Sequence, residues 1–176
     1  MNEDKYLKLL ATAIMDNPRR TTKELAEAIG ISKATLHRLY GTRENLMSIL
    51  EEQSKAVLDN IITVANAHYD DYRTGLRLLI EAHLDGNEFF LFSCHIQGCE
   101  EINKWKNYSD TIDSFFLRGQ KDGFFKIDIV AQALTEILVA DICIMIEAER
   151  RGRIASANML STIETIFLNG ALTQKD

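Results

Sequence analysis

The side chains best suited to specific chemistry lie between Ser32 and Tyr40, and that chemistry is hydrogen bonding to nucleic-acid bases. Ser32 can cap the start of a helix, while Leu36 and Tyr40, four residues apart, would turn one face of that helix toward a core. The remaining surface would present Lys33, Ala34, Thr35 and His37. A helix that enters the major groove of DNA carries short or polar side chains near its N-terminus, and this stretch has them.

The flanking residues predict a short helix before this one and a longer helix after it. Thr22 can cap the preceding helix, and Gly30 can end it in the left-handed conformation that other residues avoid. The buried face of that helix would consist of Leu25, Ala26 and Ile29. Gly41 ends the second helix, Thr42 caps the third, and Arg43 falls in its first turn. Two amphipathic helices joined by a tight turn also occur in proteins that bind no DNA, so the motif alone leaves that interpretation open.

The whole stretch Thr21–Leu46 resembles the signature region of the TetR family of bacterial transcriptional regulators. The similar residues are Thr21-Thr22, Gly30-Ile31-Ser32, Lys33-Ala34-Thr35-Leu36 and Tyr40-Gly41-Thr42-Arg43-Glu44-Asn45-Leu46. The sequence departs from the family at three positions: His37 stands where Tyr is common, Leu39 where His or Tyr is frequent, and Arg43 where Lys is usual. The departures at His37 and Leu39 affect which operator sequence would be bound rather than how DNA is bound, whereas Arg43 keeps the positive charge for a phosphate.

The resemblance implies a regulator, most simply a repressor, that binds a palindromic double-stranded DNA operator as a homodimer and is released by a small-molecule effector. Lys33, Ala34, Thr35 and His37 would face the major groove, and Thr22, Tyr40, Thr42 and Arg43 would hold phosphates. Phosphate contacts set register and much of the affinity, whereas contacts to base edges set the sequence. A second interpretation is a dimeric module of the same fold that binds a partner protein instead of an operator, and Leu39 leaves it open.

Charge is distributed unevenly along the chain, whose formal net charge is −6. Residues 1–50 hold eight Lys/Arg and six Asp/Glu, a net charge of +2, whereas residues 51–176 hold twelve and twenty, a net charge of −8. This asymmetry fits a DNA-binding head on an acidic body. We therefore divide the chain into a helix-turn-helix DNA-binding domain, residues 1–46, and a helical regulatory and dimerisation domain, residues 47–176.

Composition predicts an all-α fold of about nine helices. The chain has one proline and nine glycines, so helix-breaking residues are scarce, and it contains no long alternation of apolar and polar residues. Besides the two short helices of the motif, helices are expected over residues 4–16, 43–66, 72–84, 87–98, 100–120, 128–150 and 155–171. The helix over residues 43–66 would begin in the head and end in the body, which makes it a candidate lever between an effector site and DNA.

The last two predicted helices, residues 128–150 and 155–171, are apolar over wide faces. The resemblance implies that they pair with their copies across a two-fold axis as a four-helix bundle. Burial within one chain is the alternative, but faces of this width would leave much apolar surface exposed in a monomer. A dimer would also present two recognition helices to two half-sites about one turn of DNA apart.

Aromatic residues are frequent in the middle of the body, and the resemblance implies an effector cavity there. The predicted walls are Phe89, Phe92, His95, Trp105, Tyr108 and Phe116. Such walls suit an apolar or aromatic effector with one or two polar groups. The alternative is that these side chains simply form an aromatic core.

Catalysis, cofactors and a membrane location are not expected. The four histidines are scattered, and the chain has no glycine-rich phosphate loop, GxSxG, HExxH or paired CxxC motif. Cys94, His95 and Cys99 raise a zinc site or a redox sensor as minor alternatives, but Cys94 and Cys99 would point in different directions on a helix. With no apolar leader at the N-terminus and no run of about 18 apolar residues, a cytoplasmic protein with reduced thiols is expected.

Overall fold

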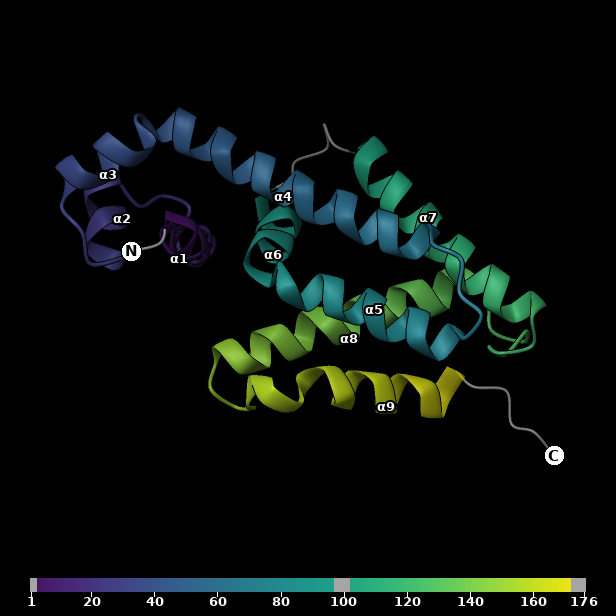
Figure 1. The fold of residues 1–176 in the computed structure, drawn as a ribbon. Helices are drawn as coiled ribbons and strands as arrows, with labels where there is room; N and C mark the ends of the chain where they lie inside the picture. Colours follow the sequence, from purple (N-terminus) through teal and green to yellow (C-terminus); the bar gives the residue numbers. More distant parts are fainter. Residues whose placement is uncertain (1–2, 97–101, 172–176) are drawn as a thin grey trace. The chain divides into compact units, whose positions relative to one another are not determined.

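The computed structural model describes residues 3–96 and 102–171, and in that part of the chain the fold is all-α (Figure 1). Its helices are α1 (Glu3–Asp16), α2 (Thr22–Ala28), α3 (Lys33–Tyr40), α4 (Arg43–Asn66), α5 (Tyr72–Asp85), α6 (Asn87–Ile96), α7 (Ile102–Lys121), α8 (Ala131–Arg150) and α9 (Met159–Ala171), with a 3-10 helix at Ser156–Asn158. The predicted fold class, all-α with about nine helices, is confirmed over the described residues.

Most helix bounds agree with the sequence prediction, and the differences have local causes. The helix predicted over residues 128–150 begins at Ala131, after Val130 in extended conformation. The helix predicted from residue 155 begins as the 3-10 turn Ser156–Asn158 and becomes α-helical at Met159. The ends of the helices predicted over residues 87–98 and 100–120 fall partly in residues 97–101, outside the described part of the chain.

The chain divides into two compact units, and the division falls inside α4. The first unit comprises residues 1–57 and 88–98, and the second comprises residues 58–87 and 99–176. The first unit thus contains α1, α2, α3, the N-terminal part of α4 and nearly all of α6. Its core is formed by Leu7, Leu10, Ala11, Ala13, Ile14, Leu25, Ala26, Leu36, Tyr40, Leu46, Leu50, Phe89 and Phe92. The short helices α2 and α3 therefore do not fold around each other alone, since α1, α4 and α6 complete their core.

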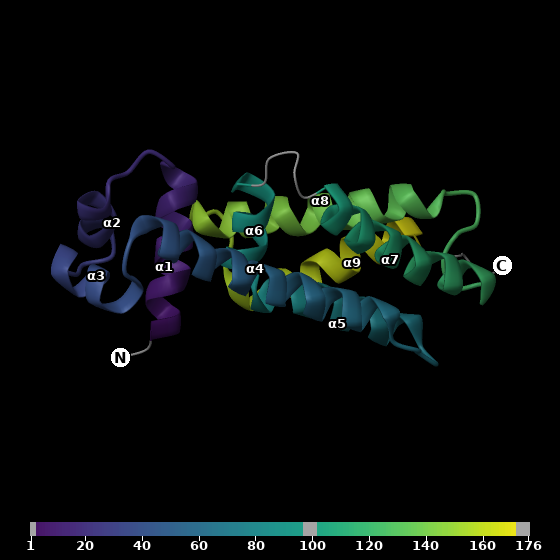
Figure 2. The same cartoon turned by 90° about the horizontal axis from the view of Figure 1, so that it is seen from above.

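The second unit contains α5, α7, α8, α9 and the C-terminal part of α4. Helices α5, α8 and α9 pack against one another, and α7 packs along α8 (Figures 1 and 2). One buried carboxylate ties two of these helices together: Glu164 of α9 accepts a hydrogen bond from Arg77 of α5 at 2.9 Å and lies 3.6 Å from Arg73. Burial of Glu164 is stable because both guanidinium groups compensate its charge.

An aromatic cluster forms much of the core of the second unit. Phe115, Phe116 and Phe125 are fully buried, and their ring centroids lie 5.0–6.0 Å apart in edge-on or tilted pairs. Phe116 also contacts Phe167 of α9 at 5.6 Å. Edge-on and tilted pairs are the arrangements that the quadrupoles of aromatic rings favour, so the cluster links α7, α9 and the segment after α7.

No helix within residues 3–96 and 102–171 combines the length and the apolar character needed to cross a bilayer. Cys94 is exposed and Cys143 is half-buried. Cys99 lies outside the described residues, so the geometry of Cys94, His95 and Cys99 lies outside them too. Elsewhere in the described part of the chain, no group of three or more His, Cys, Asp or Glu side chains is placed to hold a metal ion.

Candidate nucleic-acid interface

Helix α2 begins with a complete capping box. The Thr21 hydroxyl accepts from the Glu24 backbone N–H at 3.3 Å, and the Glu24 carboxylate accepts from the Thr21 backbone N–H at 2.6 Å. The bond from the Thr21 N–H, with a second bond that the Thr21 hydroxyl donates to the same carboxylate at 2.9 Å, holds the pKa of Glu24 below its usual value. The prediction that Thr22 caps this helix is wrong: Thr22 is its first helical residue, and the cap is one residue earlier. The capping box explains the choice, because Thr21 has a Glu three residues later and Thr22 does not.

The turn between α2 and α3 is a Schellman motif. Gly30 has φ +75°, its N–H donates to the Glu27 carbonyl at 3.1 Å, and the Ile31 N–H donates to the Ala26 carbonyl at 2.9 Å. The motif needs a left-handed residue after the helix, and glycine adopts this conformation without strain. Ile31, half-buried, packs against the core of the first unit. The predicted helix end at Gly30 is therefore correct.

Helix α3 starts at the predicted cap. The Ser32 hydroxyl accepts from the Thr35 backbone N–H at 3.0 Å, and the Ser32 and Thr35 hydroxyls lie 2.9 Å apart. Leu36 and Tyr40 are buried, with 1% and 4% of their surface exposed. The helix is thereby fixed in rotation, because two residues on one face are anchored in the core and the first turn is capped.

The exposed face of α3 is made by Lys33, Ala34, His37 and Arg38. Three of these four residues were predicted to face the groove. Thr35, also predicted to face the groove, is half-buried and lies at the edge of this face. Its hydroxyl is hydrogen-bonded to that of Ser32. Arg38 was missed. Its position four residues after Ala34 was a usable signal, since residues four apart share a helix face.

The residues predicted to hold phosphates lie at the start of α2 and where α3 ends and α4 begins. Thr42 is exposed, and its hydroxyl accepts from the Asn45 N–H at 3.2 Å as the cap of α4. Tyr40 is almost completely buried in the core of the first unit. Thr22 is half-buried at the start of α2. Thr42 therefore combines a structural role with an exposed position, while Tyr40 offers little more than the edge of its side chain.

Arg43 is a bridge between α4 and the connection from α1 to α2. Its two terminal nitrogens donate to the carbonyls of Arg20 at 2.6 Å and Pro18 at 2.8 Å. Arg20 in turn donates to the Ala13 carbonyl at the end of α1, at 2.8 Å. The guanidinium has five N–H donors, so two such bonds leave others for a phosphate. Holding the loop at residues 18–20 is the role that sequence inspection missed, since it depends on contacts 23 and 25 residues away.

Comparisons with known proteins support a helix-turn-helix motif at α2 and α3. A model of the winged helix-turn-helix DNA-binding family matches residues 5–40, which include α2, α3 and most of α1. Over 176 aligned residues the chain is 43% identical to the HTH-type transcriptional regulator NfxB of Pseudomonas aeruginosa, covering 97% of this chain and 94% of NfxB. The chain belongs to the family of helix-turn-helix transcriptional regulators.

Solved structures place this regulator's fold among those of TetR-family proteins. It resembles the TetR family regulator PfmR from Thermus thermophilus, with a TM-score of 0.66 at 18% identity, over 97% of this chain and 100% of PfmR. It also resembles SCO3833 from Streptomyces coelicolor, a member of the TetR family, with a TM-score of 0.66 at 12% identity, over 97% and 91% of the two chains. These neighbours confirm the fold that the resemblance of Thr21–Leu46 implies.

The regulator's six predicted effector contacts are divided between the two units. Phe89 and Phe92 belong to the core of the first unit, and His95 of the same helix is exposed, with Nδ1 3.0 Å from the Leu91 carbonyl. In the second unit, Tyr108 and Phe116 are fully buried, and half-buried Trp105 contacts Tyr108 edge-on at 5.3 Å. Five of these side chains have core contacts in the described structure and His95 does not, and the role of all six in effector binding stays a prediction.

Proposed function

We propose that this regulator is a homodimeric repressor that binds a palindromic operator through α3. The observation that carries the proposal is the exposed face of Lys33, Ala34, His37 and Arg38 on a helix held in rotation by its cap and core anchors. Lysine and arginine hydrogen-bond guanine in the major groove, and a methyl group such as that of Ala34 can contact thymine. Thr35 would contribute at the edge of this face.

Phosphate contacts would come from the two ends of the motif. Thr22, Thr42 and the remaining donors of Arg43 are the candidates, with Tyr40 contributing if its hydroxyl reaches the backbone. Arg43 would then act twice, since the loop that it holds carries Arg19, an exposed cation next to Pro18. We retain residues 1–46 as the DNA-binding domain and residues 47–176 as the regulatory and dimerisation domain.

Dimerisation through α8 and α9 is supported by apolar side chains that lie in water in the single chain. Ile137 and Ile144 of α8 are 50% and 61% exposed, and Ile166 of α9 is 60% exposed. Ile137 and Ile144 are seven residues apart and therefore share one face of α8. A second copy of the chain would cover them, as a two-fold dimer requires the same face on both subunits.

The proposed regulatory mechanism is a shift between two dimer populations. A small apolar or aromatic effector would favour the dimer in which the two α3 helices are wrongly spaced for consecutive major grooves, and it must prefer that state by a few kcal/mol. The regulator would act in the cytoplasm, without cofactor and without catalysis. Ligand affinity that is equal with and without operator would contradict this mechanism.

Selection of binding sequences from random duplex DNA tests the operator proposal. With the purified full chain at about 150 mM salt, where nonspecific binding is weak, we expect recovery of a palindrome with half-sites about one helical turn apart. Lys33→Ala, His37→Ala and Arg38→Ala should each change the preferred base at defined positions. Lys23→Ala, on the exposed side of α2, is the matched control and should leave the selected sequence unchanged.

Two results of this selection would contradict the proposal. Recovery of no sequence better than random DNA would direct attention to a protein partner instead of an operator. Equal losses on selected and random DNA for all three α3 variants would show that these side chains contact phosphates rather than bases.

A further inference from the structure

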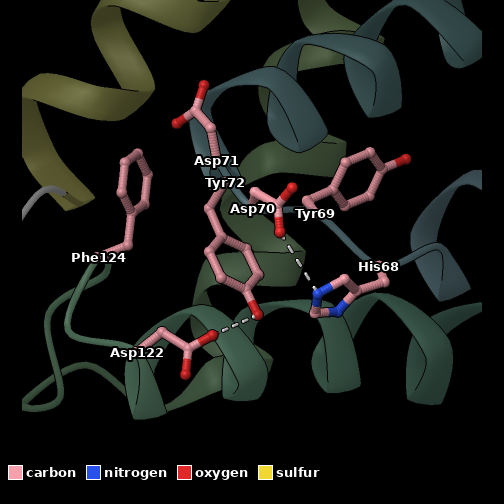
Figure 3. Close-up of a pocket in the computed structure, with 7 residues that line it drawn as sticks. All are labelled: His68, Tyr69, Asp70, Asp71, Tyr72, Asp122 and Phe124. Carbon is pink, nitrogen blue, oxygen red and sulfur yellow. Dashed lines mark hydrogen bonds and ion pairs between the residues drawn. The ribbon is translucent and has the colours of Figure 1, made fainter.

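The second unit contains a pocket of about 350 Å³ between the α4–α5 connection and the segment that follows α7 (Figure 3). Its lining residues are His68, Tyr69, Asp70, Asp71, Tyr72, Asp122 and Phe124. A volume of this size lies at the lower end of the range for small-molecule sites. None of the six residues predicted to contact an effector belongs to it, so the pocket is a separate site.

The apolar wall of the pocket is the outer edge of the aromatic core. Tyr72 is 6% exposed, and its ring centroid lies 6.1 Å from that of half-buried Phe124 and 5.6 Å from that of Phe115. Gly119 makes room for this arrangement, since a Cβ there would lie 2.5 Å from the Phe125 ring and 3.1 Å from Tyr72. A glycine inside a helix destabilises it by about 1 kcal/mol relative to alanine. At Gly119 this loss allows the rings of Phe125 and Tyr72 to pack directly against the backbone of α7.

The rim of the pocket is held in place by hydrogen bonds to the end of α4. The Tyr69 hydroxyl donates to the Val64 carbonyl at 2.8 Å, and Arg118 donates to the carbonyls of Ala65 at 2.5 Å and Ala67 at 3.4 Å. The Tyr72 hydroxyl donates to Asp122 at 2.9 Å, which joins the two sides of the pocket (Figure 3). Preformed walls lose little conformational freedom when a ligand binds.

The lining carries three carboxylates and neither lysine nor arginine. Asp70 is exposed, and its ion-pair partner is His68, 3.7 Å away, while Asp122 retains lone pairs beyond the bond from Tyr72. Asp71 caps α5 by accepting from the N–H groups of Arg73 and Thr74. The backbone N–H groups at a helix N-terminus can bind an anion, but here the N–H groups of Arg73 and Thr74 already donate to Asp71. Arg118, next to the Tyr69 and Tyr72 hydroxyls, supplies one positive charge against these three carboxylates, so the pocket stays acidic and favours cations over anions.

We propose that this pocket binds an organic cation, namely a primary ammonium group attached to a flat apolar group. The ammonium would donate charge-assisted hydrogen bonds to Asp122 and Asp70. The apolar group would lie against half-buried Phe124, whose ring face also attracts cations, and against the accessible edge of Tyr72. This site goes beyond the proposed operator binding and does not depend on it, because binding is measured without DNA.

Titration of the full chain with 2-phenylethylammonium, followed by amide chemical shifts in NMR, tests the proposal. We expect saturable shifts concentrated at residues 68–72 and 122–124, with a dissociation constant on the order of a few millimolar for a ligand of this size. The control ligand 2-phenylethanol has the same shape without the charge and should bind at least threefold more weakly. Absence of saturable shifts at these residues, or equal affinity for both ligands, would overturn the proposal.

Two substitutions locate the charge that matters. Asp70→Asn and Asp122→Asn should each weaken binding of 2-phenylethylammonium roughly threefold or more, whereas Asp85→Asn, an equal charge change at the other end of α5, should leave it unchanged. Asp70 is exposed and forms its ion pair with exposed His68, so Asp70→Asn is expected to fold normally. This holds even if Asp122→Asn, which alters the Tyr72–Asp122 hydrogen bond, disturbs the structure. Equal affinity in the wild type and Asp70→Asn, or an equal loss in Asp85→Asn, would refute the assignment.

Discussion

A buried histidine makes the stability of the second unit depend on pH. His83 is completely buried, with Nδ1 2.7 Å from the Leu79 carbonyl and Nε2 2.6 Å from the Tyr108 hydroxyl. A carbonyl only accepts hydrogen bonds, so Nδ1 carries the proton and Nε2 accepts from Tyr108. Burial away from water lowers the pKa of His83 from 6.5 to about 4, although the bond to Leu79 opposes the shift.

The sign and size of the effect follow from this difference in pKa. Between pH 6.5 and pH 4 the unfolded chain binds a proton at His83 that the folded chain does not, so acid favours unfolding. The stabilising contribution is fully present above pH 6.5 and is lost as the pH falls toward 4. Each pH unit in this interval changes the free energy of unfolding by about 1.4 kcal/mol, so the loss at pH 5 is about 2 kcal/mol.

Urea unfolding at pH 7.5 and pH 5, followed by tryptophan fluorescence, measures this loss of stability close to His83. Trp105 is the only tryptophan, and its ring lies 5.3 Å from that of Tyr108. Other ionisable groups contribute to both measurements, so the comparison is with His83→Gln, which should lose about 2 kcal/mol less than the wild type on going to pH 5. His68→Gln, an exposed histidine in the same unit, should behave as the wild type. Parallel losses in the wild type and His83→Gln would refute the argument.

Three further substitutions test other features of the structure. Arg43→Ala should lower the stability of the first unit by about 2 kcal/mol, because two carbonyls lose a charged donor; an unchanged midpoint in thermal unfolding by circular dichroism would contradict this. Gly30→Ala should cost about 1–2 kcal/mol, because alanine resists positive φ, whereas Gly170→Ala, in a helix with open space around it, should be neutral or stabilising; equal urea midpoints for the two variants would exclude the backbone explanation. Ile144→Asp should convert a dimer to a monomer in analytical ultracentrifugation, while Ile127→Asp, at a residue that is 83% exposed outside α8, should not; a dimeric Ile144→Asp variant would remove α8 from the interface.

Local signals explain why the helix-turn-helix could be predicted almost to the residue. Gly30 and Ser32 each act through their own backbone or hydroxyl on residues no more than four positions away, so their effect is visible in sequence. The error at Thr22 had a local remedy, because Glu24 completes a capping box only with Thr21. Arg38 lies four residues after Ala34 on the exposed face of α3, so helical spacing carries the signal that places it there.

The effector contacts were harder to predict from the sequence, because burial alone does not distinguish a core residue from a residue that lines a cavity. Phe92 and Phe116 have nearly the same exposed fraction, 1% and 0%, yet they belong to different units. The pocket at Tyr72 joins residues 50 positions apart through the bond to Asp122. No periodicity of a single helix records such a pairing, so only the three-dimensional structure reveals it.

The structure gives a physical reason for arginine at position 43, where the family pattern has lysine. A lysine, usual at this position in the family that Thr21–Leu46 resembles, offers a single point of charge. The arginine offers a planar fork, and here its two terminal nitrogens reach the carbonyls of Pro18 and Arg20 at once. The arginine therefore keeps the positive charge of a lysine and also fixes the position of the loop beside it. Arg43→Lys separates the two effects: it should keep the salt dependence of DNA binding while losing part of the thermal stability.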